Sequence, residues 1–544
     1  FRRRSNSEGK KGMIVKMKNK KTEIAIIILF LILQTLLYIY VGTQKAYLHI
    51  DEVYSYGLAN YDKIDIQENS DFFNTWHTKE YYADYLAVQD KDVGNYTPVY
   101  ENQKNDVHPP LYYLLLRFAM GIAKGHISKW IGITVNIFIY AAITIVMYFI
   151  LQKILENKKH YKIKALLLAF LSSILLASLS NVVYIRMYAL STLLIVITSY
   201  LHMKLWEKQE ISKKLLFAIG ITVLAGILTH YYYIFYIAML FILFVYKYIK
   251  EKNKKALLYY VTTILLAGMV SLFLFPYSIE HIFFGYRGKG VMQNLKDISQ
   301  IPISFALQIY TLNYYAFNGS LLILLLIALG IYLYSKIKKI TIPKETSKTK
   351  EMLTILWLPS LFFFIMATIA SPWRVLRYIV PVCGILSILV LYEIYRLLQS
   401  VTTEKISNIL MTVLCIFLIL APVFFHLEPE LLYRDKKEIV QKVSGELNLP
   451  TIYLYNTQKG GFLDDILLFS QINESYIAKD ISVTENTIKS IVKNKDISKG
   501  ILLFINKEKE EENEIISNQV KQYLNFNNIE HVKRLSNCDV YYLH

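Results

Sequence analysis

The sequence has few cysteines. It holds only three cysteines: Cys383 and Cys415 lie in apolar runs, and Cys538 stands alone near the end. They show no metal-ligand spacing and predict no intrachain disulfide outside the apolar runs. Residues 426–544 contain neither a G-x-G-x-x-G fingerprint nor a phosphate-binding loop. The cysteines therefore predict no metal site, and residues 426–544 carry no nucleotide-binding motif.

Charged residues are also scarce. They make up 19% of the chain, whereas 54% of the residues are hydrophobic, and the mean hydropathy is +0.33. A water-soluble enzyme of this length needs more polar surface. The apolar residues are concentrated in runs of the length that crosses a bilayer, about 20 residues. These features predict a polytopic α-helical membrane protein.

The net charge of +18 could suggest a nucleic-acid partner. However, the lysines gather in short loops between the apolar runs, at 158–164, 204–214, 247–255 and 336–350. This is the positive-inside pattern of membrane topology. The pattern excludes a nucleic-acid partner and predicts that the N-terminus and every second loop are cytoplasmic.

We predict about eleven transmembrane helices and a small external domain. The expected spans are 23–42, 129–152, 164–181, 188–205, 214–229, 232–248, 256–276, 320–336, 352–370, 376–398 and 407–425. The corresponding domains are a basic cytoplasmic N-terminus at 1–22, a transmembrane domain at 23–425 with a first external loop at 43–128, and an external domain at 426–544.

One apolar segment, 109–124, is short for a span and carries Arg117 in its middle. If it crossed the membrane, every later loop would change sides and the lysine-rich loops would face outward. We therefore predict an interfacial amphipathic helix on the outer surface, with Pro109 and Pro110 at its start.

Residues 426–544 alternate between strand-like and helix-like stretches, which predicts a small α/β domain. The expected strands are 451–455, 475–478, 501–505 and 540–543. The expected helices are 464–471, 485–493 and 510–525.

The first candidate site is the pair Asp51 and Glu52, a few residues beyond the end of the first span. One interpretation is structural, because a carboxylate at a helix start meets free N–H groups. The other is catalytic: an acceptor hydroxyl attacks poorly unless a carboxylate takes its proton. One such base suffices when the leaving group is a phosphate.

His108 lies where the acidic external loop meets the predicted interfacial helix. It is either an ordinary interface residue at a helix start or a group at headgroup depth that contacts a phosphate or a sugar. His230, in a run with three tyrosines at another outer turn, is similarly either part of an aromatic belt or a polar contact.

Three arginines, Arg186, Arg374 and Arg377, are predicted at outer turns, against the positive-inside trend. A single arginine at a span edge often extends its head into the interface. Three of them together with an acidic pair indicate an anion site, and a lipid-linked phosphate suits the planar guanidinium.

These motifs together resemble the GT-C superfamily of membrane glycosyltransferases, in the protein O-mannosyltransferase-like group, which includes the aminoarabinose transferase of lipid A. The resemblance covers roughly residues 20–425 and leaves out the rest. The stretches that carry it are Asp51-Glu52, Asp106-Val107-His108-Pro109-Pro110-Leu111, Arg186-Met187-Tyr188, Thr229-His230-Tyr231 and Arg377-Tyr378.

The resemblance implies an inverting transfer of a sugar from a polyprenyl-phosphate donor, with Asp51 as the base. It implies a membrane lipid as donor, and an acceptor that is a protein, a lipid or a polysaccharide. Members often carry an arginine where this chain has Lys129, which we take as its substitute. No cofactor is implied with certainty, since some relatives use a divalent metal and others do not.

The resulting hypothesis is a glycosyltransferase in a plasma membrane, and the resemblance and composition favour a bacterial one. Asp51 deprotonates the acceptor, and Glu52 and His108 position acceptor or donor. The carrier phosphate is bound by the cationic and polar groups Lys129, Arg186, Tyr188, His230, Arg374 and Arg377. The main alternative is a transporter or flippase of lipid-linked sugars, which would place its charges near the bilayer midplane. A second alternative is a non-catalytic scaffold whose domain at 426–544 binds a partner.

Overall fold

The computed structural model describes residues 2–208, 210–446, 448–506 and 510–544. The chain divides into two compact units. The first comprises the chain up to Val41, Asn136–Val182 and Met187–Glu430. The second comprises Gly42–Val135, Val183–Arg186 and Leu431–His544.

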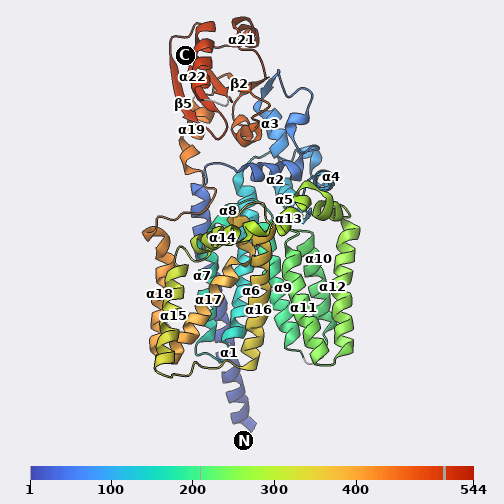
Figure 1. The fold of residues 1–544 in the computed structure, drawn as a ribbon, viewed down its shortest axis with the longest axis vertical. Helices are drawn as coiled ribbons and strands as arrows, with labels where there is room; N and C mark the ends of the chain where they lie inside the picture. The colour runs from blue at the N-terminus through green and yellow to red at the C-terminus, as the bar shows by residue number, and fades with distance from the viewer. Residues whose placement is uncertain (1, 209, 447, 507–509) are drawn as a thin grey trace. The chain divides into compact units, whose positions relative to one another are not determined.

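The first unit is built from long apolar helices that lie side by side, among them α9, α10, α11, α12 and α16 (Figure 1). The long helices that begin or lie in this unit are α1 (Arg2–Gln44), α6 (Lys129–Leu155), α7 (Tyr161–Ile174), α8 (Leu176–Val183), α9 (Tyr188–Trp206), α10 (Lys213–Ile227), α11 (Tyr233–Lys250), α12 (Lys254–Leu274), α13 (Tyr286–Lys296), α14 (Ile301–Ala316), α15 (Leu321–Ile337), α16 (Ser347–Ala370), α17 (Val380–Val401) and α18 (Glu404–Phe424). Shorter helical turns are η3 (Glu280–Phe284), η4 (Ile298–Gln300) and η5 (Leu376–Tyr378).

Eight helices of the described residues are long and apolar enough to cross a membrane. Two bent pairs, α7 with α8 at 57° and α14 with α15 at 91°, raise this number to ten if each pair is one span. The remaining expected span, 214–229, is α10, a helix of 15 residues. The prediction of a polytopic helical membrane protein is confirmed, and the chain is a multi-pass membrane protein.

The second unit contains the segment that follows α1. Its elements there are α2 (Ile50–Asn60), η1 (Ile66–Glu68), β1 (Trp76–Thr78), α3 (Lys79–Leu86), η2 (Asp90–Asp92), α4 (Thr97–Asn105) and α5 (Leu111–Ile122). The helix expected at 109–124 is present as α5, with Pro110 at its N-cap.

Arg117 on α5 is almost completely buried and joins α5 to the end of α2. Its guanidinium donates to the main-chain carbonyl of Asn60 at 3.0 Å, to the Asn60 side-chain oxygen at 2.9 Å and to the carbonyl of Asp92 at 2.8 Å. A cation at the C-terminal end of a helix also meets the negative end of the helix dipole. Arg117 therefore helps to fix the helix that carries Asp51.

Residues 431–544 belong to the same unit and form a mixed sheet with flanking helices. The elements are η6 (Arg434–Lys436), α19 (Lys437–Gln441), η7 (Lys442–Glu446), β2 (Thr451–Tyr455), η8 (Phe462–Asp465), α20 (Ile466–Phe469), β3 (Glu474–Lys479), α21 (Glu485–Val492), β4 (Ile501–Ile505), α22 (Glu510–Tyr523), β5 (Ile529–Arg534) and β6 (Asp539–Leu543). All four expected strands are present, and β1 and β5 were not expected.

The strand order is β1-β3-β2-β4-β6-β5. β2 pairs in parallel with both β3 and β4, while the pairs at both ends of the sheet are antiparallel. All five residues of β2 and of β4 are buried, because helices or aromatic side chains cover both faces of the centre. The edge strand β1 comes from the segment after α1, so this sheet is completed by a part of the chain that lies some 400 residues earlier in the sequence.

Candidate functional site

Asp51 and Glu52 lie in the first turn of α2, whose N-cap is His49. The His49 imidazole Nδ1 accepts a hydrogen bond from the Asp51 N–H at 3.1 Å, and the Glu52 carboxylate accepts one from the His49 N–H at 2.7 Å. The helix-start interpretation of the pair is therefore correct as a description of the backbone. In this cap the N-cap residue is His49, and the carboxylate that takes part is that of Glu52.

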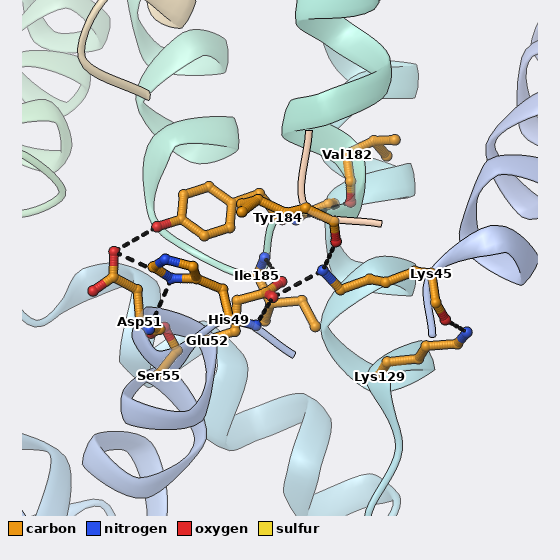
Figure 2. Close-up of polar contacts among 11 residues, drawn as sticks. Lys45, His49, Asp51, Glu52, Ser55, Lys129, Val182, Tyr184 and Ile185 are labelled. Atoms are coloured by element: carbon orange, nitrogen blue, oxygen red, sulfur yellow. Dashed lines mark hydrogen bonds and ion pairs between the residues drawn. The ribbon is translucent and has the colours of Figure 1, made fainter. Parts of the chain in front are cut away.

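The two carboxylates have different surroundings, as Figure 2 shows. Glu52 is completely buried: it accepts from the Lys45 ammonium at 2.8 Å and from the Ile185 N–H at 2.9 Å. Burial lowers the pKa of Lys45, and the neighbouring Glu52 opposes this. Both oxygens of Glu52 are thus engaged by protein donors, which favours a positioning role.

Asp51, in contrast, keeps 26% of its side chain exposed. Its carboxylate accepts a hydrogen bond from the Tyr184 hydroxyl at 2.7 Å (Figure 2). The Arg186 guanidinium is 5% exposed and donates to the Asp51 main-chain carbonyl at 3.1 Å. The structure therefore places an oriented, partly accessible carboxylate next to a buried guanidinium.

His108 forms a close pair with Asp106, with 2.8 Å between Nδ1 and the carboxylate. Burial and Arg186 lower the pKa of His108, whereas Asp106 and Asp51 act to raise it. Burial acts to raise the pKa of Asp106, but His108 and Arg186 outweigh it and the pKa falls below its usual range. Arg186 and Asp51 therefore lie near enough to His108 for their charges to act on it, and we call Asp51, His108, Arg186 and their partners the Asp51 cluster.

Lys129, at the start of α6, is joined to the same region through the main chain. Its ammonium donates to the carbonyl of Lys45 (Figure 2). Because that bond leaves the other two N–H groups of the ammonium for further partners, Lys129 retains capacity for an anion.

The remaining predicted residues lie in the first unit and form an aromatic cluster with arginines. The Tyr188 ring lies 5.3 Å from His230 and 6.4 Å from Tyr378, and the rings of Tyr232 and Tyr378 are 5.8 Å apart. His230 is 7% exposed and accepts a hydrogen bond from the Tyr232 N–H. His230, Tyr188 and Tyr378 are therefore brought together.

Arg377 and Arg374 lie beside this cluster. The Arg377 guanidinium lies 5.4 Å from the centre of the Trp373 ring. Arg374 donates to the Ser304 hydroxyl at 2.7 Å and to the Ser371 carbonyl. Trp373, Arg374 and Ser304 also line a cavity of about 480 Å³.

A third arginine, Arg287 on α13, was not anticipated. Its guanidinium lies 4.6 Å from the same Trp373 ring that Arg377 contacts. Burial, Tyr378 and Tyr188 raise the pKa of Tyr232, and the guanidiniums of Arg287 and Arg374 act against this. The sequence did contain a signal for Arg287. Residues 277–319 are predicted to be external, and an external arginine runs against the positive-inside trend, as at Arg374 and Arg377.

Lys45 and Tyr184 were also missed as members of the Asp51 cluster. A lysine just beyond a span reads as an interface residue, and a tyrosine at an outer turn reads as part of an aromatic belt. Only their contacts with other residues of the site, in the folded protein, distinguish Lys45 and Tyr184 from ordinary interface residues. Among the described residues, no group of three or more His, Cys, Asp and Glu side chains is arranged to hold a metal ion.

No protein-family model matches the chain, and no curated protein matches its sequence. The structure is similar to that of ArnT from Cupriavidus metallidurans, bound to undecaprenyl phosphate and in the apo state. The TM-score is 0.49 for both, the identities are 8% and 9%, and the alignments cover 95% of this chain and 98% of ArnT.

The structure is also similar to the oligosaccharyltransferase AglB from Archaeoglobus fulgidus, solved in complex with an inhibitory peptide and a dolichol-phosphate. The TM-score is 0.44 at 10% identity, and the alignment covers 90% of this chain and 70% of AglB. At such identities the likeness concerns the fold, so we infer the function from this chain's own residues.

Proposed function

We propose that the protein is a glycosyltransferase that moves a sugar from a polyprenyl-phosphate donor to an acceptor hydroxyl. The reaction is a single displacement with inversion at the anomeric carbon. The acceptor oxygen forms the new bond to this carbon, and the bond from the carbon to the phosphate oxygen breaks. The electron pair of that bond leaves with the carrier phosphate, and the hydroxyl proton goes to Asp51.

The observation that carries this proposal is the contrast between the two adjacent carboxylates. Asp51 is partly exposed and oriented by Tyr184, whereas Glu52 is buried with both oxygens engaged. A general base must reach the proton that it takes. Asp51 also lies on α2, outside every helix of the described residues that is apolar and long enough to span a membrane. A carrier would be expected to place such a charge within a span.

Each unit contains one group of cations that we propose as candidate ligands of the carrier phosphate. Arg186, with His108 and Lys129 as further ligands, belongs to the Asp51 cluster. In the first unit, Arg377 and Arg287 contact the Trp373 ring, and Arg374 lines a cavity together with Trp373. Tyr188 and His230 belong to the aromatic cluster of the same unit. A guanidinium suits this task because its planar donors match phosphate oxygens and stabilise the charge that develops on the leaving group.

The test is to incubate the purified protein with a panel of polyprenyl-phosphate sugars and to measure release of the polyprenyl phosphate. We expect the wild type to release the carrier from at least one donor and Asp51→Asn to lose at least about a hundredfold in rate. Asp51→Asn should keep its expression level and melting temperature, because Asn can still accept from Tyr184. Normal turnover by this variant would refute the base assignment, and transport of the intact donor without carrier release would favour a flippase.

A further inference from the structure

The segment between α1 and α2, which leads directly into Asp51, is bound to residues more than 380 positions later. The Ala46 N–H donates to the carbonyl of Leu432 at 2.7 Å, and the Lys45 ammonium donates to the carbonyl of Leu431 at 2.8 Å. The next residue, Tyr47, donates its hydroxyl hydrogen to the carboxylate of Asp465 at 3.1 Å. Three consecutive residues are therefore fixed by residues 431–544.

The Tyr47–Asp465 contact is a buried polar junction. Tyr47 is 2% exposed, Asp465 is completely buried, and the Cys538 thiol donates to the second oxygen of Asp465 at 3.4 Å. The ammonium of Lys436 lies 4.6 Å from the centre of the Tyr47 ring. Because a buried donor without a partner is costly, the Tyr47 hydroxyl has a strong preference for this one position.

The chain on the other side of α2 is attached to the same residues. The Trp76 indole N–H donates to the carbonyl of Ile491 at 3.0 Å, and β1 pairs with β3. The hydroxyls of Tyr82 and Ser475 are 2.8 Å apart. Both ends of the segment that carries α2 are therefore held by residues 431–544.

We propose that residues 431–544 help to position the carboxylate of the transfer site. Among them, Asp465 acts through its hydrogen bond to Tyr47 as a positioning residue for Asp51. This inference rests on the proposed function. The junction fixes the backbone four residues before Asp51, and so sets where the carboxylate stands relative to its partner Tyr184. Misplacement of a reacting group by about 1 Å can cost about a hundredfold in rate.

The neighbouring Asp464 supports this placement. The charges that act on the pKa of Asp464 include His49, which lowers it, and Asp51, which raises it, although burial is the largest effect and raises it. η8, which holds both Asp464 and Asp465, also contacts α2 directly. The junction is therefore close to the reacting carboxylate in space as well as in sequence.

The experiment compares variants of the full-length protein in the carrier-release assay and in hydrogen–deuterium exchange. Asp465→Leu removes the acceptor of the Tyr47 hydrogen bond, and Tyr47→Phe removes only its donor. We expect Asp465→Leu to lower kcat by at least about tenfold, and Tyr47→Phe by several-fold, with the donor KM changed less than about twofold. Asp465→Asn, which still accepts from Tyr47, should recover most of the kcat that Asp465→Leu loses.

Tyr542→Phe is the matched control. It removes a tyrosine hydroxyl that donates to the Lys499 carbonyl in the same sheet region, and its kcat should equal that of the wild type. In exchange measurements, peptides covering 45–55 should exchange faster in Asp465→Leu and Tyr47→Phe, while peptides from the long helices of the first unit should not change.

The outcomes separate the two proposals. Wild-type kcat and unchanged exchange at 45–55 in Tyr47→Phe would overturn the positioning role, even if Asp465→Leu unfolds residues 431–544 as a whole. A different result is that the wild type releases no carrier while Asp465→Leu and Tyr47→Phe still exchange faster at 45–55. That result would support the junction and refute the proposed transfer.

Discussion

At the scale of single residues, burial separates two adjacent carboxylates that the sequence presents as equals. Glu52 forms an ion pair with Lys45 in which both side chains are fully buried. A buried ion pair adds little stability over apolar residues, but removing one partner leaves a buried charge without compensation. Glu52 is therefore better suited to hold α2, the end of α1 and Ile185 together than to exchange protons with a substrate.

The ion pair gives a prediction about double substitution. Lys45→Met should lower the free energy of unfolding by about 3–5 kcal/mol, because Glu52 is left buried and charged. Lys45→Met combined with Glu52→Gln should recover most of this loss and a large part of the transfer rate, since the introduced amide still accepts one backbone N–H. Chemical or thermal unfolding in detergent and the carrier-release assay measure both. If the double variant is stable but as inactive as Asp51→Asn, the Glu52 carboxylate takes part in the reaction itself.

His108 gives a prediction about pH. Its pKa in the folded protein lies below the ordinary value of 6.5, mainly because of burial. As the pH falls below 6.5, the unfolded chain takes up a proton at this histidine before the folded protein does, so stability should decline with falling pH. We expect the melting temperature of the wild type to fall more steeply between about pH 7 and pH 5 than that of His108→Gln. Parallel curves for the two proteins would contradict this.

At the scale of elements, α2 is held at its start by Glu52 and at its end by Arg117. Arg117→Met should lower the free energy of unfolding by about 1.5–3 kcal/mol, since two buried oxygens of Asn60 and the partly buried carbonyl of Asp92 lose a charged donor. Lys124→Met, which removes the exposed ion pair with Asp90 from the end of the same region, is the control and should have little effect. Equal melting temperatures for the two variants would show that Arg117 does not fix α2.

The sequence predicts the buried central strands of the sheet better than its exposed edge strands. β4 is a continuous apolar run, and β2 is one after its first residue, Thr451, because both faces of these strands are covered. Their bounds follow from the sequence. β5 is an edge strand whose residues are mostly polar or half exposed, so it lacks an apolar pattern. β1 has three residues and exists only because it pairs with β3, a partner that no local pattern can specify.

At the scale of the whole molecule, the distribution of lysines predicts which loops face the cytoplasm. A cysteine introduced at Asn95 or Lys499 should react with a membrane-impermeant maleimide added to intact cells, whereas one at Lys344 should react only after permeabilisation. The wild type is the control, since Cys383 and Cys538 are buried and Cys415 lies within α18. Labelling of Lys344→Cys in intact cells would contradict the predicted topology and indicate the opposite orientation.

Bent helices mark where span prediction from hydropathy was incomplete. The expected span 164–181 consists of α7 and α8, which meet at 57°, and the expected span 320–336 is preceded by α14 at 91°. Average hydropathy over a window does not register a bend, because the residues on both sides remain apolar. α13, with Arg287, lies just before α14 and was missed because its mixed polar and apolar residues give no span signal.

The membrane class, most of the helices, the central strands and the residue types of the candidate site could all be predicted from the sequence. This is possible because apolar length, lysine distribution and short motifs are local properties of the chain. The tertiary structure was needed to show that Asp51 is partly exposed and Glu52 is not, that Lys45 contacts Glu52 and Tyr184 contacts Asp51, and that residues 431–544 share a unit with the segment after α1. These facts depend on burial and on partners that are mostly distant in the sequence, which no local pattern encodes.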